Sequence, residues 1–346
     1  MTQPASPAAP APASRPRWHG WAVPAVILVA GLASVAANPG LRSLFAQAAR
    51  QIDPLAVLVT LPVQLVAILV CTAAQQALNI GVPFRASFLA RLTRDAGHNL
   101  LIFPPGMGEA IGARMLVLAG GKARAALMLR VLDVAAEVLA ELPYMALAGW
   151  VVAGFWLGGH GAAGLPSGGG ASAAHGWLVA GGMVALVLLL VGLAARRWWR
   201  GLPQGHRLRR RIAAEWHLLR REMHRQRTGL PLAIGLHVIG WGLSGVQVWL
   251  AAGVFGLHLS LFSALAIESA ATSARVILFF VPGGLVMQEA GAVLAGAALG
   301  VPAPMALALS LVLRLRDVAF GAALLLWPAM EWRARRQQAR PRAALA

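Results

Sequence analysis

Two stretches decide the fold of this chain: Leu129–Ala135, which reads LRVLDVA, and Leu313–Ala319, which reads LRLRDVA. Each follows a Pro-Gly break that leads to a glutamate, FPPGMGE over Phe103–Glu109 and FVPGGLVMQE over Phe280–Glu289. Both copies lie in strongly apolar surroundings, where arginine and carboxylate side chains are costly to bury. Duplicated, interrupted apolar segments that carry charge are typical of membrane proteins built from two repeats.

The composition is that of an integral membrane protein. Of 346 residues, 58% are hydrophobic and 12% are charged, and the mean hydropathy is +0.68, far from the averages of soluble domains. A helix that spans a bilayer needs about 20 predominantly apolar residues. The candidate stretches are 21–38, 55–78, 137–157, 176–195, 230–253 and 304–330.

The net charge of +18 does not indicate a nucleic-acid partner, because the basic residues flank the apolar stretches. Eleven arginines lie between Arg196 and Arg227, and five lie between Arg333 and Arg342. Basic loops of this kind stay on the cytoplasmic side of a membrane. The pattern predicts a multi-pass membrane protein with both termini in the cytoplasm.

The basic loops fall on one side only if both Pro-Gly segments are re-entrant. We therefore predict an all-α integral membrane protein with about six transmembrane helices and two re-entrant helical hairpins. The hairpins enter from opposite faces, so that the units 55–157 and 230–330 form an inverted-topology repeat. The predicted hairpin tips are Pro105, Gly106, Gly108, Pro282, Gly283 and Gly284.

The domain organisation is simple. Residues 1–17 are rich in Pro, Ala and Ser and predict a disordered tail. Residues 18–330 are expected to form a single membrane domain, and residues 331–346 a basic cytoplasmic tail. Within the loop 196–229, apolar residues recur at spacings of three and four opposite arginines, which predicts an amphipathic helix on the inner surface.

Charged side chains inside the apolar segments need a reason to be there. Asp133 and Glu137 are four residues apart and share a helix face, and Arg130 lies three residues from Asp133, where it can pair with it. Arg314 and Asp317 repeat this spacing. Such charges either fix helix packing as ion pairs or line a polar cavity. The repetition favours the cavity.

Glutamates follow both breaks, where a half-helix is expected to begin. Glu109 and Glu289 either cap the free N–H groups there or face a polar lipid headgroup at the hairpin tips. Arg114 either pairs with Glu109 or binds a phosphate. Arg275 shares a face of the second hairpin's entry helix with Glu268, which indicates cavity lining and packing equally.

The sequence contains none of the common motifs for hydrolysis, phosphate binding or metal ligation, such as HExxH, CxxC, GxSxG or a P-loop. We therefore predict no catalytic residue, no metal site and no cofactor. His98 and Asn99, just before the first break, are candidates for hydrogen bonding to a headgroup.

Several segments carry a resemblance to a known family. They are Asn99–Pro104, Gly108–Glu109, Val131–Asp133 with Glu137, Phe279–Leu285 with Gln288–Glu289, and Ala306–Leu311 with Arg314. They resemble the transmembrane region of the lysylphosphatidylglycerol synthase family, and most nearly its hopanoid-biosynthesis-associated members (HpnL type). The resemblance covers about residues 20–330, although the first break is less glycine-rich than the family pattern. In this family the membrane region is associated with moving or handling lipids.

The resemblance implies a function at the level of lipid handling. Full-length synthases add a soluble aminoacyltransferase domain at the C-terminus; this chain ends at Ala346, so lysyl transfer is not expected. We expect a non-enzymatic inner-membrane translocase or lipid-handling protein for hopanoids or anionic phospholipids. The residues expected to bind the lipid are Glu109, Arg114, Arg130, Asp133, Glu137, Arg275, Glu289, Arg314 and Asp317.

Two other functions stay open at this point. One is an accessory scaffold of membrane hopanoid biosynthesis, whose enzymes would then be partners of this chain. The other is an intramembrane lipid-modifying enzyme that uses Asp133 or Glu137 as an acid or base.

Overall fold

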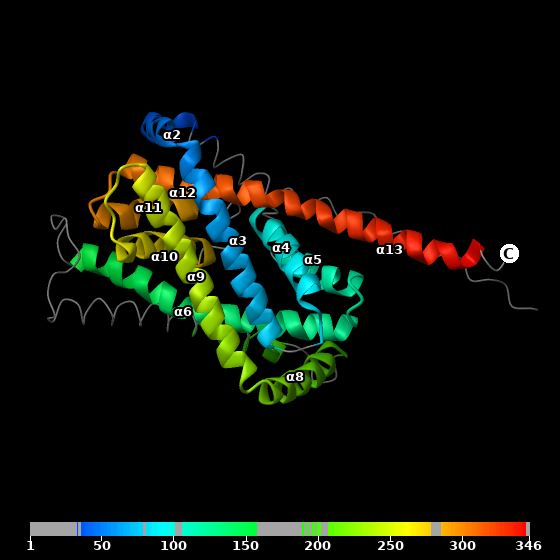
Figure 1. The fold of residues 1–346 in the computed structure, drawn as a ribbon. Coiled ribbons are helices and arrows are strands. Elements are labelled where there is room, and N and C mark those ends of the chain that lie inside the picture. Colours follow the sequence, from blue (N-terminus) through cyan, green and yellow to red (C-terminus); the bar gives the residue numbers. More distant parts are fainter. Residues whose placement is uncertain are drawn as a thin grey trace, which may run out of the picture.

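The computed structural model describes residues 36–78, 81–100, 106–157, 207–277 and 285–343, together with Ala33 and a few residues between 189 and 201. The regular structure in these residues is entirely helical (Figure 1). The helices are α2 (Pro39–Gln51), α3 (Pro54–Ala77), α4 (Phe84–Leu100), α5 (Met107–Leu118), α6 (Ala123–Leu157), α8 (Arg207–Arg225), α9 (Gly229–Val254), α10 (Leu261–Ile277), α11 (Leu285–Ala298), α12 (Ala303–Gly321) and α13 (Leu326–Ala343), with a 3₁₀ turn, η1 (Ala322–Leu325), between the last two.

Helices α3 and α9 pack against each other as a long antiparallel pair (Figure 1). The side chains of Gln64 and Gln247 meet near the middle of α3, and Gly229 packs against the Ala77 carbonyl at one end of the pair. Gly240 makes the close approach possible, because a methyl group there would lie 2.6 Å from the Cys71 sulfur. Small residues at helix crossings are the usual means of tight packing in membranes. Both helices are long and apolar enough to cross a bilayer.

Local sequence explains where these helices begin. Asp53 is the N-cap of α3 and accepts a hydrogen bond of 2.7 Å from the Leu55 N–H, while Pro54 occupies the first helical position. Asn38 caps α2 in the same way, accepting from the Leu41 N–H at 3.1 Å. Both residues provide an oxygen for N–H groups that have no partner within the helix.

Each Pro-Gly break lies between two helices that pack on each other, α4 with α5 and α10 with α11. Gly106 precedes α5 with φ +81°, a conformation that favours glycine. At Gly108 an added methyl group would lie 2.7 Å from the Arg94 carbonyl oxygen, and at Gly291 it would lie 2.5 Å from that of Ala270. Both helix pairs therefore approach closely at a glycine, although Gly108 precedes Glu109 whereas Gly291 follows Glu289. The tip residues Pro105, Pro282, Gly283 and Gly284 lie outside the described residues.

The order of elements is the same in both halves: a long helix, a pair of packed helices, and another long helix. The predicted helices 55–78 and 230–253 are confirmed as α3 and α9, and 137–157 is the second part of α6. The helical segment predicted at 304–330 consists of α12, η1 and the start of α13. The segments 1–17, 21–38 and 176–195 lie wholly or largely outside the described residues.

Two differences from the sequence prediction concern the ends of the fold. Helix α2 was not predicted, since its 13 residues are too polar for a span. The basic segment 331–346, for which no secondary structure was predicted, lies in α13 as far as Ala343.

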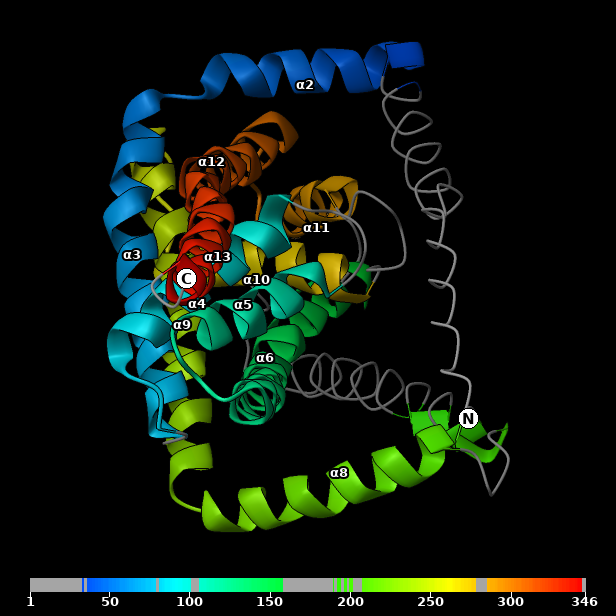
Figure 2. The ribbon, with the colours of Figure 1, turned by 90° about the vertical axis from the view of Figure 1, so that its right-hand side faces the viewer.

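Helices α2 and α8 run across opposite ends of the α3–α9 pair (Figure 2). Helix α8 is the amphipathic helix predicted within 196–229. Its Leu219 packs beside a core formed by small and aliphatic residues of α3, α4, α5, α6 and α9, including Leu116, Leu129 and Ala233. The core beneath α8 is therefore shared by helices of both halves.

Candidate functional site

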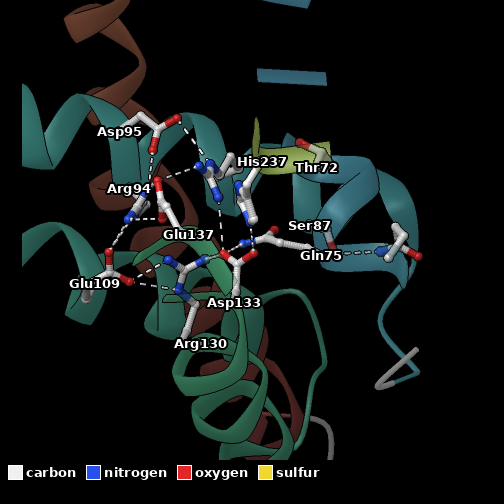
Figure 3. Close-up of polar contacts among 12 residues, drawn as sticks. Thr72, Gln75, Ser87, Arg94, Asp95, Glu109, Arg130, Asp133, Glu137 and His237 are labelled. Carbon is white, nitrogen blue, oxygen red and sulfur yellow. Dashed lines mark hydrogen bonds and ion pairs between the residues drawn. The ribbon is translucent and has the colours of Figure 1, made fainter. Parts of the chain in front are cut away.

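A cluster of charged residues lies where α4, α5 and α6 meet α3 and α9 (Figure 3). We call it the first-half cluster. It consists of Arg91, Arg94 and Asp95 on α4, Glu109 on α5, and Arg130, Asp133 and Glu137 on α6, with Gln75 of α3 and His237 of α9.

Asp133 is the centre of this cluster and is completely buried. One carboxylate oxygen accepts hydrogen bonds from Gln75 Nε2 at 2.8 Å, Arg91 Nη1 at 3.1 Å and Arg130 Nη1 at 2.9 Å. The other oxygen lies 3.0 Å from His237 Nε2. Its four partners come from α3, α4, α6 and α9. One carboxylate thus joins both halves of the molecule.

The three arginines of the cluster share the remaining carboxylates. Arg94 bonds both Glu109 and Glu137, at 2.6 Å and 2.8 Å, and Arg91 bonds Glu137 at 3.0 Å. Arg130 approaches the second oxygen of Glu109 through two nitrogens, at 3.0 Å and 2.5 Å. Because a buried charge is tolerated only when it is paired and hydrogen-bonded, these shared contacts explain how so many charges fit among apolar helices.

A second set of charged residues lies on α10, α11 and α12, and we call it the second-half cluster. It consists of Glu268, Arg275, Glu289, Arg314, Arg316 and Asp317. Arg314 Nε bonds Glu289 at 3.1 Å, and Arg316 Nη2 bonds Asp317 at 2.7 Å. Arg316 also donates to Gln247 of α9, and Thr272 donates to Glu268.

Hydrogen bonding in the second-half cluster is incomplete. Arg275 forms no ion pair with another described residue. Several buried polar atoms in and around this cluster have no partner among the described residues: Arg275 Nε, Arg314 Nη2, Glu289 Oε2, Gln288 Oε1, Ser273 Oγ, Ser310 Oγ and Glu141 Oε1. In the first-half cluster only Gln75 Oε1 is in this state. Unpartnered buried groups cost about 1–3 kcal/mol each, so the difference between the clusters needs a physical explanation.

A cavity of about 140 Å³ lies between the two clusters. One side is lined by Arg91, Arg94, Asp95, His98, Asn99 and Glu137, and the other by Glu268, Thr272, Arg275, Gln288, Arg316 and Asp317. Helices α3 and α9 complete the wall with residues such as Gln64 and Ser244. The cavity is therefore polar and receives side chains from both helix pairs.

The structure brings together most of the residues singled out in the sequence. Glu109, Arg130, Asp133 and Glu137 belong to the first-half cluster, and Arg275, Glu289, Arg314 and Asp317 to the second. Arg114 joins neither, because its guanidinium bonds Glu331 of α13 at 2.6 Å and 2.9 Å.

The expectation that Arg314 and Asp317 pair as Arg130 and Asp133 do is wrong. Arg130 bonds Asp133, but Arg314 bonds Glu289 and leaves Asp317 to Arg316. The extra arginine at position 316, where the first half has Leu132, provides a nearer partner for Asp317. What the halves do share is a bond from the helix arginine to the glutamate after the break, Arg130 to Glu109 and Arg314 to Glu289. These glutamates accept from arginines rather than acting simply as helix caps.

Sequence reasoning missed several members of these networks, among them Arg91, Arg94, His237 and Gln247. Neither arginine was singled out, because both lie in a stretch with other basic residues such as Arg85. A signal was present, however, since Arg91 and Asp95 are four residues apart on one helix face. His237 and Gln247 stand alone in an apolar helix and gave no pattern. Within the described part of the chain, no three His, Cys, Asp or Glu side chains form a group that could hold a metal ion.

These features define a class: an all-helical membrane protein with two similarly ordered halves and a charged cavity between them. The sequence model of the family described as "Lysylphosphatidylglycerol synthase TM region" matches residues 21–324. The chain belongs to this family. Searches of curated proteins and of solved structures give no match.

Proposed function

We propose that this protein handles membrane lipids, by binding a lipid headgroup in the cavity between the two clusters and passing the lipid between leaflets. The observation that carries the proposal is a polar cavity lined from both helix pairs, in a chain of a family tied by name to a lipid synthase's membrane region. A headgroup needs polar surroundings to cross the apolar interior of a bilayer. The acyl chains can meanwhile remain in the surrounding lipid.

The arginine at position 275 favours an anionic headgroup. Its side chain lines the cavity and forms no ion pair with a described residue. Every arginine of the first-half cluster, in contrast, bonds at least two carboxylates. A phosphate would complete the pairing of Arg275, and Thr272 and His98 line the same space. An anionic phospholipid is therefore the preferred substrate class, and a hydroxyl-bearing hopanoid is the other class to test.

The arrangement of the halves suggests how transport proceeds. The antiparallel course of α3 and α9 fits an inverted-topology repeat, in which each Pro-Gly segment is a re-entrant hairpin from its own side of the membrane. Movement of one helix pair relative to the other would then open the cavity to each leaflet in turn. With the basic helix α8 on the cytoplasmic face of the inner membrane, α2 lies on the opposite face.

The test is translocation of fluorescent lipids in proteoliposomes. Wild-type protein is expected to move a labelled phosphatidylglycerol between leaflets faster than empty vesicles, and Arg275→Gln to reduce that rate about tenfold or more, since hydrogen bonds to charged groups contribute about 1.5–3 kcal/mol. Arg114→Gln is the matched control, because Arg114 is also a hairpin arginine but lies outside the cavity. It should retain the wild-type rate.

Labelled hopanoid and labelled phosphatidylcholine are compared in the same vesicles. Selective movement of the hopanoid would replace the anionic substrate class with that lipid. Wild-type rates equal to those of empty vesicles for all three lipids would contradict the proposal and favour a scaffold that moves no lipid.

A further inference from the structure

We propose that a second lipid site lies in the groove between α6 and α8, where it holds an acyl chain of an anionic phospholipid from the leaflet that α8 covers. The groove encloses about 300 Å³ and is lined by Leu127, Met128 and Val131 of α6 and by Trp216 and Leu219 of α8. Among the described residues that line it, only Arg124 and Glu215 are charged. It is separate from the central cavity, with which it shares no lining residue.

Three apolar side chains of the groove are exposed. Leu127 is 57% exposed, Val131 41% and Trp216 55%. Contiguous exposed apolar surface of this kind marks a membrane or ligand contact. Because the groove is bounded by two helices, it offers a lipid chain more contact than a single helix surface does. A chain lying between α6 and α8 would cover Trp216 and Val131 at the same time.

The charge of α8 selects the class of lipid. Between Arg207 and Arg225 the sequence contains seven arginines and two glutamates. Each basic side chain near a membrane surface attracts anionic lipid by about 1 kcal/mol. Arg124 contributes directly at the groove, where its bond to Glu215 is long, 3.6 Å, and exposed, so its other donors can reach a phosphate. A neutral lipid would fill the apolar groove but gain nothing from these arginines.

The position of the groove links it to the charged network without making it part of that network. Arg130 and Val131 are neighbours in sequence, but Arg130 bonds Asp133 and Glu109 while Val131 lines the groove. Helix α6 therefore has the first-half cluster on one face and the groove on another. A lipid held in the groove would support the face of α6 that protein atoms leave uncovered.

The experiment measures quenching of Trp216 by lipids with brominated acyl chains. The full chain is reconstituted in phosphatidylcholine vesicles doped with brominated phosphatidylglycerol or brominated phosphatidylcholine at equal fractions. The contribution of Trp216 is the difference between wild type and Trp216→Phe. We expect brominated phosphatidylglycerol to quench it more strongly, and Arg124→Gln to lower the preference about fivefold, the equivalent of one basic contact.

Matched variants separate a site from general membrane contact. Val131→Phe should fill the groove and remove the preference, whereas Val238→Phe, at an α9 position of similar exposure (43%), should not. Arg85→Gln, which removes an exposed arginine that does not line the groove, should leave the preference unchanged.

Three results would overturn the proposal. Equal quenching by the two lipids would mean that Trp216 meets only bulk acyl chains. Absence of quenching would mean that protein covers the groove. A preference that survives Val131→Phe would place the lipid elsewhere. None of these results bears on the central cavity, because the translocation assay with Arg275→Gln tests that site independently.

Discussion

The two halves of the molecule present nearly the same helices but treat their charges in opposite ways. In the first-half cluster, three arginines and four carboxylates bond one another so completely that a single buried side-chain atom lacks a partner. In the second-half cluster, Arg275 forms no ion pair with a described residue, and Arg314 and Glu289 each leave one buried atom without a partner. Two similar arrangements of helices thus hold one network whose charged groups are paired and one in which several buried polar atoms have no partner.

The difference indicates that the two clusters have different roles, one in holding the structure and the other in binding a ligand. A network in which every member is paired resists rearrangement, since moving any helix breaks several charged hydrogen bonds at once. A network with free donors and acceptors has the groups that a ligand needs, at a cost in stability that a bound ligand can offset. We infer that the first half holds the cavity in shape and that the second half offers a ligand the cavity-lining residues with unpartnered groups, Arg275 and Gln288.

The largest expected effect is the loss of stability in Asp133→Asn. The amide would leave Arg91 and Arg130 without the buried carboxylate that they share, and removing one partner of a buried ion pair costs about 3–5 kcal/mol. Asp317→Asn is the matched variant of the second half, and it should cost less, because Asp317 bonds one arginine. Thermal unfolding of the detergent-solubilised proteins measures both. Equal losses would remove the contrast between the clusters.

Smaller losses of stability, equal in the two halves, are expected when the glycine at the close contact within each helix pair is replaced by alanine. Gly108→Ala and Gly291→Ala both place a methyl group against a backbone carbonyl, at 2.7 Å and 2.5 Å. Overpacking of this kind costs about 1–3 kcal/mol. The same unfolding assay should give similar losses for the two variants, since the halves share their packing even though they differ in charge. A loss at only one of them would show that the resemblance of the two helix pairs is superficial.

The sequence predicted the framework better than it predicted the contacts. Apolar length located α3 and α9 to within one residue at each end, because a bilayer-length helix leaves a clear hydropathy signal. The repeated spacing of Arg130 and Asp133 correctly indicated one buried pair. The same spacing was misleading at Arg314, which bonds Glu289 on another helix instead of Asp317. The spacing of residues along one helix gives no information about the distances between side chains on different helices.

Residues that stand alone were the least predictable. His237 contacts Asp133, which lies 104 positions away in the sequence, and nothing around it in α9 is charged. Arg275 was recognised only as one of two charges on a helix face, and its lack of an ion-pair partner became visible once its neighbours were placed. Patterns within a helix can be read from sequence, whereas the satisfaction of a buried group depends on all the helices around it.

The smallest effect on stability is expected when the ion pair between Arg114 and Glu331 is removed. This exposed pair lies outside both clusters, so the buried pairs can be compared with it. The hydrogen bond from Arg114 lowers the pKa of Glu331 below the ordinary value of 4.5. A carboxyl group whose pKa is lower in the folded state stabilises the fold above its ordinary pKa, and this contribution is lost as the pH falls through the lowered value. Arg114→Gln should therefore lower the melting temperature slightly at neutral pH and not at all in acid, as melts at both pH values would measure. Exposed pairs contribute little because water screens them, so a loss as large as that of Asp133→Asn would show that burial is not what distinguishes the first-half cluster.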